Sequence, residues 1–257
     1  MILIDTHAHL YLPHFADDID QVICNAADSK VVKILLPNID TDSVSPMLDL
    51  CRKFPLQCHP MIGLHPSSVG KDYRDKLALL ESMTENKYFT AIGETGMDAY
   101  WDTTFLQEQK DSFIMHLEWA KKMDIPVVIH SRETMDIVLE VLKAQKGDRL
   151  RGVFHAFSGT IEQAVNIISL GFKLGIGGVV TYKNSGLSPV IESLDLENFI
   201  LETDSPYLTP VPHRGKRNES ANLLLIAQKI AEIKEIPVEE VAGTTSSTAA
   251  RLFNLDL

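Results

Sequence analysis

Eight short runs of apolar and β-branched residues recur along the chain, and longer amphipathic segments separate them. The runs cover residues 2–5, 31–37, 59–64, 89–94, 126–130, 152–155, 172–176 and 199–202. Their first residues lie 20 to 37 residues apart, which is close to the length of one strand-and-helix unit. Because short strands that alternate with helices form parallel sheets, this spacing predicts eight parallel strands in a closed sheet.

The intervening segments carry the periodicity of helices that bury one face. The clearest apolar stripes are Leu106, Phe113, Leu117 and Ala120; Met135, Val138, Leu139 and Leu142; and Leu223, Ile226, Ala227, Ile230 and Ile233. We interpret these stripes as surfaces that pack against the sheet. The chain contains no linker or low-complexity stretch, and about 250 residues form one barrel in many proteins. We therefore predict a single (β/α)8 barrel domain of the TIM type over residues 1–257.

Composition constrains the location and the partners of the protein. The 257 residues are 45% hydrophobic and 23% charged, which is typical of a soluble globular protein. The chain shows no secretion signal and no uncharged apolar run long enough to span a membrane, so we expect a cytoplasmic protein. Its three cysteines have no C-x-x-C spacing, which fits reduced structural thiols. The net charge of −11 would repel a polyanion, so a nucleic-acid substrate requires a local basic rim or metal ions.

Residues able to bind metal ions gather at the predicted carboxyl ends of the strands, where a barrel places its active site. Six of the eight strand ends carry such a group. A single histidine there would more often be structural, but a whole set on one face of the barrel predicts a metal site. The candidate ligands are His7, His9, Glu94, His130, His155 and Asp204.

This ligand set is too large for one four-coordinate ion with an open position, so it favours two divalent ions. Glu94, from the middle of the ring of strands, would bridge the ions at roughly 3.5–4 Å. Imidazole and carboxylate groups without thiolates suit Zn, Mn, Fe, Ni, Co or Mg, of which Mg, Mn and Zn are our candidates. A water held between two such ions supplies hydroxide near neutral pH, and Asp204 would both bind an ion and accept the proton. Glu94 and Asp204 are the expected catalytic residues.

Further polar residues follow the same strand ends. For His65 we favour contact with a substrate phosphate, or support of the ligands, over direct metal binding. A basic set is predicted at the barrel mouth, where it would bind phosphates or form ordinary solvated surface: Arg132, Lys183, Arg214, Lys216 and Arg217. Asp98, Tyr100 and Trp101 lie in the loop after the fourth strand, where the aromatic rings would either stack on a base or cover the mouth.

Seven motifs resemble those of the TatD-type metal-dependent deoxyribonucleases, a family within the amidohydrolase superfamily. They are IDTHAHL at 4–10, GLHP at 63–66, GETGMD at 93–98, IHSR at 129–132, HAFSG at 155–159, ETDSPYL at 202–208 and PHRGKRN at 212–218. The likeness runs in order from residue 4 to about residue 253. It implies a TIM-like barrel with a binuclear centre that acts as a Mg-dependent 3′-to-5′ exonuclease on single-stranded DNA. It also implies that His7, His9, Glu94 and Asp204 hold one ion and that Glu94, His130 and His155 hold the other.

The chain departs from the family pattern at two positions. Tyr11 stands where Asp or Asn often follows the His-Leu pair, and Ser220 stands where Pro commonly follows Asn218-Glu219. We expect neither residue to touch a ligand, so the metal site should be intact and the substrate rim altered.

Three functions remain under comparison. The first is a deoxyribonuclease, and the second is a small-molecule amidohydrolase, lactonase or phosphoesterase on the same metal centre. Relatives that act on cyclic amides often bridge their metals with a carbamylated lysine, whereas residues 89–95 offer Glu94 and no lysine, which favours the nuclease. The third is a non-catalytic barrel, against which the complete ligand set argues. DNA or another phosphodiester is the expected partner, and the oligomeric state is left open.

Overall fold

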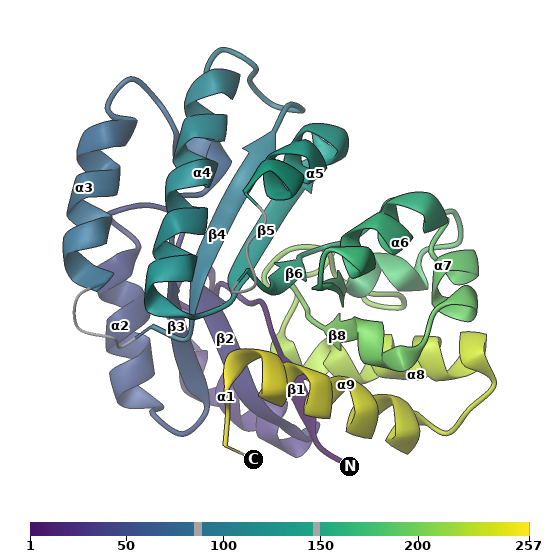
Figure 1. The fold of residues 1–257 in the computed structure, drawn as a ribbon. Coiled ribbons are helices and arrows are strands. Elements are labelled where there is room, and N and C mark those ends of the chain that lie inside the picture. The colour runs from purple at the N-terminus through teal and green to yellow at the C-terminus, as the bar shows by residue number, and fades with distance from the viewer. Residues whose placement is uncertain (85–88, 146–149, 257) are drawn as a thin grey trace.

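A computed structural model describes residues 1–84, 89–145 and 150–256, which form a barrel of parallel strands (Figure 1). Each strand pairs in parallel with the next in chain order, from β1 to β8. The strands are β1 (Leu3–Asp5), β2 (Val31–Pro37), β3 (Cys58–Ile62), β4 (Ala91–Asp98), β5 (Val127–Arg132), β6 (Gly152–Phe154), β7 (Phe172–Ile176) and β8 (Phe199–Leu201). The predicted (β/α)8 fold is confirmed.

Helices follow the strands and pack around the outside of the sheet (Figure 1). They are α1 (Ile19–Asp28), α2 (Val44–Lys53), α3 (Tyr73–Thr84), α4 (Leu106–Met123), α5 (Met135–Ala144), α6 (Ile161–Ser169), α7 (Ser188–Ser193), α8 (Leu223–Lys234) and α9 (Val238–Phe253). Short 3-10 turns include η1 (Pro13–Phe15), η2 (Pro66–Ser68) and η3 (Gly178–Thr181). The predicted stripes face the core, since Phe113 and Leu117 of α4, Val138 of α5 and Ile226 and Ile230 of α8 are fully buried.

The carboxyl-terminal helix α9 lies across one end of the barrel, close to both chain termini (Figure 1). Its Leu252 and Phe253 belong to one apolar cluster with the inward-facing side chains of β1 to β6 and β8. Those side chains are Ile4, Leu35, Met61, Ala91, Val128, Val153 and Ile200. The hydroxyl of Ser246 also donates a hydrogen bond to the carbonyl of Ile2. Apolar side chains thus fill the interior from this end, which leaves the carboxyl ends of the strands for polar groups.

The barrel closes where the ends of β1 and β8 meet. The backbone N–H of Asp204 donates to the carbonyl of His7 at 2.8 Å. The carboxylate of Asp5 accepts hydrogen bonds from the backbone N–H and the hydroxyl of Thr203, at 2.9 and 2.6 Å. Burial raises the pKa of Asp5 to about 7, although these hydrogen bonds act in the opposite direction. The closure places His7 and Asp204 next to each other.

The strand β4 is longer than the sequence predicts, because it ends at Asp98 rather than at Glu94. The additional residues pair with β5, with Gly96 opposite His130 and Asp98 opposite Arg132. Gly96 permits this close pairing, because its φ is +133° and a Cβ there would lie 2.0 Å from the carbonyl oxygen of His130. The other strand ends lie within two residues of the predicted ones. Asp98 therefore sits at a strand end instead of in a loop.

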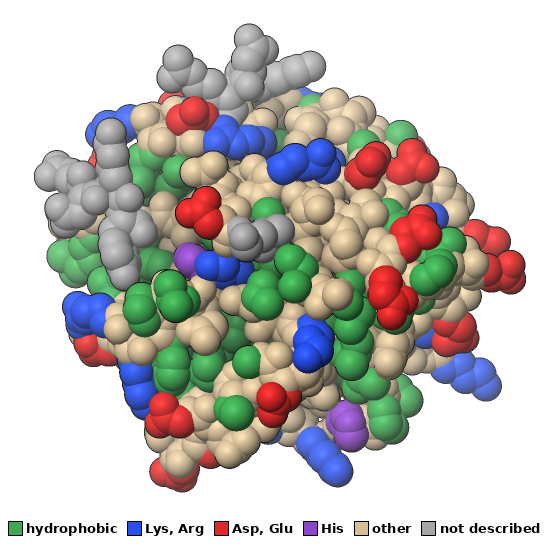
Figure 2. Space-filling model, turned by 90° about the horizontal axis from the view of Figure 1, so that it is seen from below, with side chains coloured by type: hydrophobic (Ala, Val, Ile, Leu, Met, Phe, Trp, Pro, Cys, Tyr) green, Lys and Arg blue, Asp and Glu red, His purple; other side chains and the backbone are tan. Residues whose placement is uncertain are grey.

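The surface is of mixed charge (Figure 2) and the cysteines are unpaired, as the composition suggests. The face seen from below in Figure 1 carries interspersed acidic, basic and apolar side chains (Figure 2). No helix in the described parts of the chain is long and apolar enough to cross a membrane. The cysteines are free thiols, and burial raises the pKa of Cys51 to about 12.

Candidate metal centre

The side chains predicted as metal ligands converge at the carboxyl ends of the strands. They come from segments far apart in sequence: His7 and His9 follow β1, Glu94 lies in β4, His130 lies in β5, His155 follows β6, and Asp204 follows β8. Among the described residues, their ligand atoms fall into overlapping groups within each of which the atoms lie within 4.8 Å of one another: His7, His155 and Asp204; His7, His9 and Glu94; and Glu94 and His130 together with His65. The structure thus brings the predicted set together in one place.

Glu94 lies in the middle of this centre, and its two carboxylate oxygens face different histidines. Oε2 lies 3.1 Å from Nε2 of His7 and 3.6 Å from Nε2 of His9. Oε1 lies 3.0 Å from Nδ1 of His130 and 3.2 Å from Nε2 of His155. The carboxylate therefore separates two sets of imidazole nitrogens, one at each of its oxygens.

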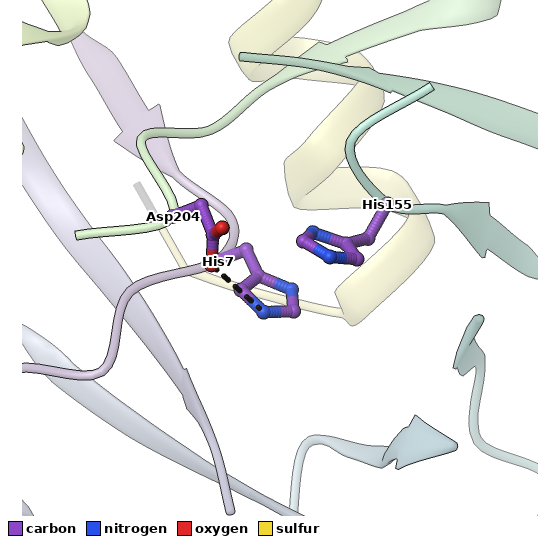
Figure 3. A group of neighbouring side chains, drawn as sticks. All are labelled: His7, His155 and Asp204. Atoms are coloured by element: carbon purple, nitrogen blue, oxygen red, sulfur yellow. Dashed lines mark ion pairs between the residues drawn. The ribbon is translucent and has the colours of Figure 1, made fainter. Parts of the chain in front are cut away.

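Asp204 completes the set on the Oε2 side of Glu94. Its Oδ1 lies 3.5 Å from Nε2 of His9 and 3.8 Å from Nε2 of His7. Figure 3 shows the Asp204 carboxylate next to the His7 ring, with the His155 ring on a separate segment beside it. The rings of His7 and His155 stack with centroids 3.8 Å apart and planes 17° apart. The two sets of ligands are therefore in direct contact.

The electrostatics of the centre suit a cation. Burial opposes ionisation of Glu94, but the surrounding histidines, above all His155, hold its pKa well below its usual range. Burial likewise opposes ionisation of Asp204, and a hydrogen bond from His9 helps to lower its pKa. Both carboxylates are therefore anionic near neutral pH. Among the described residues, their ion-pair partners are histidines rather than Lys or Arg. A divalent ion could take the place of the protons on these histidines, because neutral imidazoles and carboxylates are metal ligands.

Hydrogen bonds behind the histidines determine which ring nitrogen faces Glu94. Nε2 of His130 lies 2.9 Å from Oδ2 of Asp98 and Nδ1 lies 3.0 Å from Oε1 of Glu94, so a neutral ring that donates to Asp98 would offer its Nδ1 lone pair to a metal ion. Nδ1 of His155 lies 3.1 Å from Oε1 of Glu202 and Nε2 lies 3.2 Å from Oε1 of Glu94, so a neutral ring that donates to Glu202 would offer its Nε2 lone pair to a metal ion. Carboxylates that accept the outer N–H of a metal-binding histidine are a common feature of metal sites.

His65 differs from these ligands in its protonation. The backbone N–H of Ser67 donates to Nδ1 of His65 at 3.1 Å, so the neutral ring carries its proton on Nε2. That Nε2 lies 3.4 Å from Oε1 of Glu94. A protonated nitrogen donates a hydrogen bond and cannot bind a metal, which supports the predicted supporting role of His65.

The chain matches the model of the TatD-related DNase family over residues 4–254. It belongs to that family. The chain is 33% identical over 256 residues to the uncharacterized metal-dependent hydrolase YabD of Bacillus subtilis, a match that covers 99% of this chain and 100% of YabD. It is 34% identical over 263 residues to the uncharacterized metal-dependent hydrolase YcfH of Escherichia coli, covering 100% and 97% of the two chains. The crystal structure of YjjV, a TatD homologue from Escherichia coli, superimposes with a TM-score of 0.93 at 31% identity and covers 99% and 98%. This TatD-family chain is thus a metal-dependent hydrolase.

The basic residues predicted at the mouth of this TatD barrel differ in their contacts and in their exposure to solvent. Arg217 forms ion pairs with Asp18 and Glu219, both at 2.7 Å. Its guanidinium also lies 4.7 Å from the centroid of the Phe15 ring. Because these contacts occupy its hydrogen-bonding fork, the structure favours a structural role for Arg217 over the substrate contact that the sequence suggests.

The other basic residues have exposed side chains: Arg132, Lys183, Arg214 and Lys216. The guanidinium of Arg214 lies 4.4 Å from the Tyr182 centroid, and that of Arg132 lies 3.6 Å from the Tyr100 centroid. These contacts hold two cations on aromatic faces and leave their positive charge at the mouth of the TatD barrel.

Tyr11 corrects one expectation, because this departure from the TatD pattern does touch a ligand. Its hydroxyl donates to the carbonyl of Pro37 at 2.6 Å and accepts from Nδ1 of His9 at 3.0 Å. The phenol reaches His9 across a turn, in which the backbone N–H of Leu12 donates to the carbonyl of His9 at 3.1 Å. Strand alternation does not extend into this turn, so the sequence pattern could not identify the contact of Tyr11 with His9. Asp98 was missed for a different reason, because its contact with His130 depends on the extension of β4.

Proposed function

We propose that this TatD-family hydrolase is a deoxyribonuclease that shortens single-stranded DNA from its 3′ end with two divalent ions at Glu94. The observation that carries the proposal is the division of the Glu94 carboxylate, whose oxygens face separate sets of histidine nitrogens. His7, His9 and Asp204 would hold one ion, and His130 and His155 the other. Mg, Mn or Zn suits this combination of imidazole and carboxylate ligands.

When bound, divalent ions acidify water and stabilise the negative charge that builds up on phosphoryl oxygens. Asp204 is the carboxylate suited to accept the proton from the attacking water, because its side chain is 14% exposed whereas that of Glu94 is 3% exposed. Glu94 keeps the two sets of ligands at a fixed separation. His65 carries a proton on Nε2 and can donate it in a hydrogen bond to a phosphate oxygen.

Positive charge at the barrel mouth supports a phosphodiester substrate. The chain as a whole carries a net charge of −11, which disfavours long-range attraction of DNA. The exposed side chains of Arg132 at the end of β5, Lys183 after β7, and Arg214 and Lys216 after β8 lie at the end of the barrel that holds the centre. Local cations of this kind position a phosphate backbone without reading its sequence.

The test is digestion of a 5′-labelled single-stranded oligonucleotide by the purified protein with Mg or Mn, beside an EDTA control. The expected result is a ladder of products that shorten from the 3′ end and disappear with EDTA. Glu94→Gln should abolish the ladder and reduce the metal content measured by mass spectrometry. Glu192→Gln alters an exposed glutamate of α7 and should leave both unchanged.

Two results would contradict this proposal. A protein that holds two ions per chain and cleaves no oligonucleotide would overturn the nuclease and favour hydrolysis of small esters, lactones or amides. A Glu94→Gln variant that keeps both ions and full activity would remove the bridging role of Glu94.

A further inference from the structure

We propose that Trp101, Tyr100 and Arg132 form a stacking platform for an unpaired nucleobase of the substrate strand. The inference rests on the proposed function, and it names the part of the substrate that this region contacts. We call these three residues the Trp101 platform.

The platform presents aromatic surface to solvent beside the metal centre. Trp101 is 73% exposed and Tyr100 is 49% exposed. Their rings meet edge to face, with centroids 4.9 Å apart and planes 89° apart. Two adjacent aromatic side chains this exposed need an explanation, because such groups cost solvation energy unless a partner covers them.

Arg132 adds positive charge to the same surface. Its guanidinium lies 3.6 Å from the Tyr100 centroid and 5.4 Å from the Trp101 centroid. The cation covers part of Tyr100, whereas Trp101 keeps most of its surface open. A nucleotide matches this arrangement, since a base would stack on the open ring while its phosphate lies near the guanidinium.

Asp98 joins the platform to the metal centre. Its Oδ1 accepts the backbone N–H groups of Tyr100 and Trp101 at 2.9 and 3.4 Å. Its Oδ2 accepts Nε2 of His130 at 2.9 Å. The same carboxylate therefore fixes the platform loop and orients a candidate ligand, so the position of one is tied to that of the other.

The strand β5 sets the reach of the platform. Arg132 lies two residues beyond His130 on the same side of the strand, roughly 7 Å further along. The backbone N–H of Ala99 donates to the carbonyl of Arg132 at 3.0 Å, which holds the loop against this strand end. The platform thus lies at the rim of the site. A single DNA strand bound at the metal centre would pass over it on leaving the barrel.

An unpaired base fits this surface better than a duplex does. In a duplex the base faces are already stacked, whereas a single strand can place one base on an open ring. Stacking also tolerates any base, because every base has a π face, and it suits an enzyme that removes nucleotides in succession. Loss of one such contact is expected to weaken binding about tenfold.

Fluorescence tests the contact without turnover. The chain has two tryptophans, and Trp119 of α4 is 4% exposed, so quenching by a bound base reports on Trp101. The metal-loaded protein is titrated with a single-stranded oligonucleotide whose phosphorothioate linkages resist cleavage. We expect strong quenching, which weakens when the nucleotides near the 3′ end are replaced by abasic residues.

Kinetics test the role in catalysis. Trp101→Ala should raise KM for a normal oligonucleotide about tenfold with little change in kcat, and Trp101→Phe should restore part of the loss. On an abasic oligonucleotide the wild type and Trp101→Ala should have the same KM, because the base that stacks is missing. Leu56→Ala removes an apolar side chain that is 75% exposed before β3, at the opposite end of the barrel, and should change nothing.

The outcomes separate the platform from the proposed function. Cleavage of a normal oligonucleotide with an unchanged KM in Trp101→Ala would overturn the platform and leave the nuclease intact. A wild-type protein that cleaves no oligonucleotide would overturn the nuclease. The fluorescence titration then decides the platform, because no quenching, or equal quenching by normal and abasic strands, contradicts base stacking.

Discussion

At the residue scale, Tyr11 shows how one hydroxyl can orient a metal-binding side chain. The hydroxyl lies 3.0 Å from Nδ1 of His9, while Nε2 of the same ring faces Glu94 and Asp204, so a neutral His9 that donates to Tyr11 would offer its Nε2 lone pair to a metal ion. Tyr11→Phe keeps the ring but removes this contact, and we expect metal affinity to fall about 10- to 100-fold. Titration with Zn or Mn against a chromophoric chelator measures the change.

Tyr182→Phe provides the matched control for this substitution. The Tyr182 hydroxyl also donates to a backbone carbonyl, that of Thr209, at 2.9 Å, and in the described part of the chain its hydrogen bond does not involve a candidate metal ligand. Both variants lose a hydrogen bond to a backbone carbonyl that contributes about 1 kcal/mol, and Tyr11→Phe also loses the contact with His9, so the free energies of unfolding of the two variants should differ by no more than about 1 kcal/mol. Equal metal affinity in the two variants would show that Tyr11 does not orient His9.

The ligands themselves could be predicted from sequence, whereas the groups behind them could not. His7 and Asp204 follow strands and Glu94 ends the predicted fourth apolar run, and a barrel places such positions on one face. The contacts of Asp98 with His130 and of Arg217 with Asp18 cannot be predicted from the periodicity of the strands. Arg217 forms an ion pair with Asp18, which is 199 residues away in sequence, and its predicted substrate contact stays a prediction.

At the scale of single elements, the buried neutral side chain of His116 links α4 to Leu64, in the loop that follows β3. Nδ1 of His116 donates to the carbonyl of Ser112 at 2.7 Å, and its Nε2 accepts the N–H of Leu64 at 3.0 Å. Only the neutral ring can make both bonds. Burial lowers the pKa of His116 from its ordinary value of 6.5 to about 4.

This pKa predicts acid sensitivity of the fold. The unfolded chain binds the proton from about pH 6.5 downward and the folded protein only near pH 4, so stability from the neutral ring is lost between these values. Between about pH 7 and pH 4.5, the wild type should lose about 2 kcal/mol more free energy of unfolding than His116→Gln does. Denaturant titrations at several pH values measure both slopes. If the free energies of unfolding of the wild type and of His116→Gln changed equally with pH, the prediction would be contradicted, whatever the difference between them at pH 7.

The helix α9 acts as the closing element of the barrel interior. Phe253 is 3% exposed and packs with side chains from strands around the barrel. Phe253→Ala should lower the free energy of unfolding by about 3–5 kcal/mol, because it leaves a cavity at this end. Thermal unfolding measures the loss, and Leu79→Ala, at a 48% exposed position of α3, should cost under about 0.5 kcal/mol. If Phe253→Ala lowered the free energy of unfolding only slightly, the packing of α9 against the barrel interior would not be needed for the stability of the barrel.

Strand periodicity predicted the elements well and one boundary badly. Parallel strands are buried on both faces, so their apolar runs stand out from the amphipathic helices. The end of β4 was misplaced, because Gly96 and Thr95 do not continue the apolar run. What extends this strand is close pairing with β5, which a glycine permits and an apolar pattern does not report.

At the scale of the whole molecule, the metal centre and the apolar cluster that contains Leu252 and Phe253 of α9 lie at opposite ends of the barrel. Removal of metal by EDTA should therefore leave the far-ultraviolet circular dichroism unchanged at room temperature. It should lower Tm by about 5–10 °C, because ligand at about 100 times its Kd adds about 3 kcal/mol to a chain of this size. Collapse of the circular dichroism signal with EDTA would show that the metal is needed for the fold itself.

The seam between β1 and β8 also has a consequence for the order in which the protein matures. His7 and His9 emerge from the ribosome early, but Asp204, their neighbour, emerges only after three quarters of the chain has been made. The backbone bond from Asp204 to His7 forms only when the last strand docks on the first. A nascent or truncated chain without Asp204 would thus lack one of the candidate ligands, and we expect hydrolase activity only after the barrel has closed.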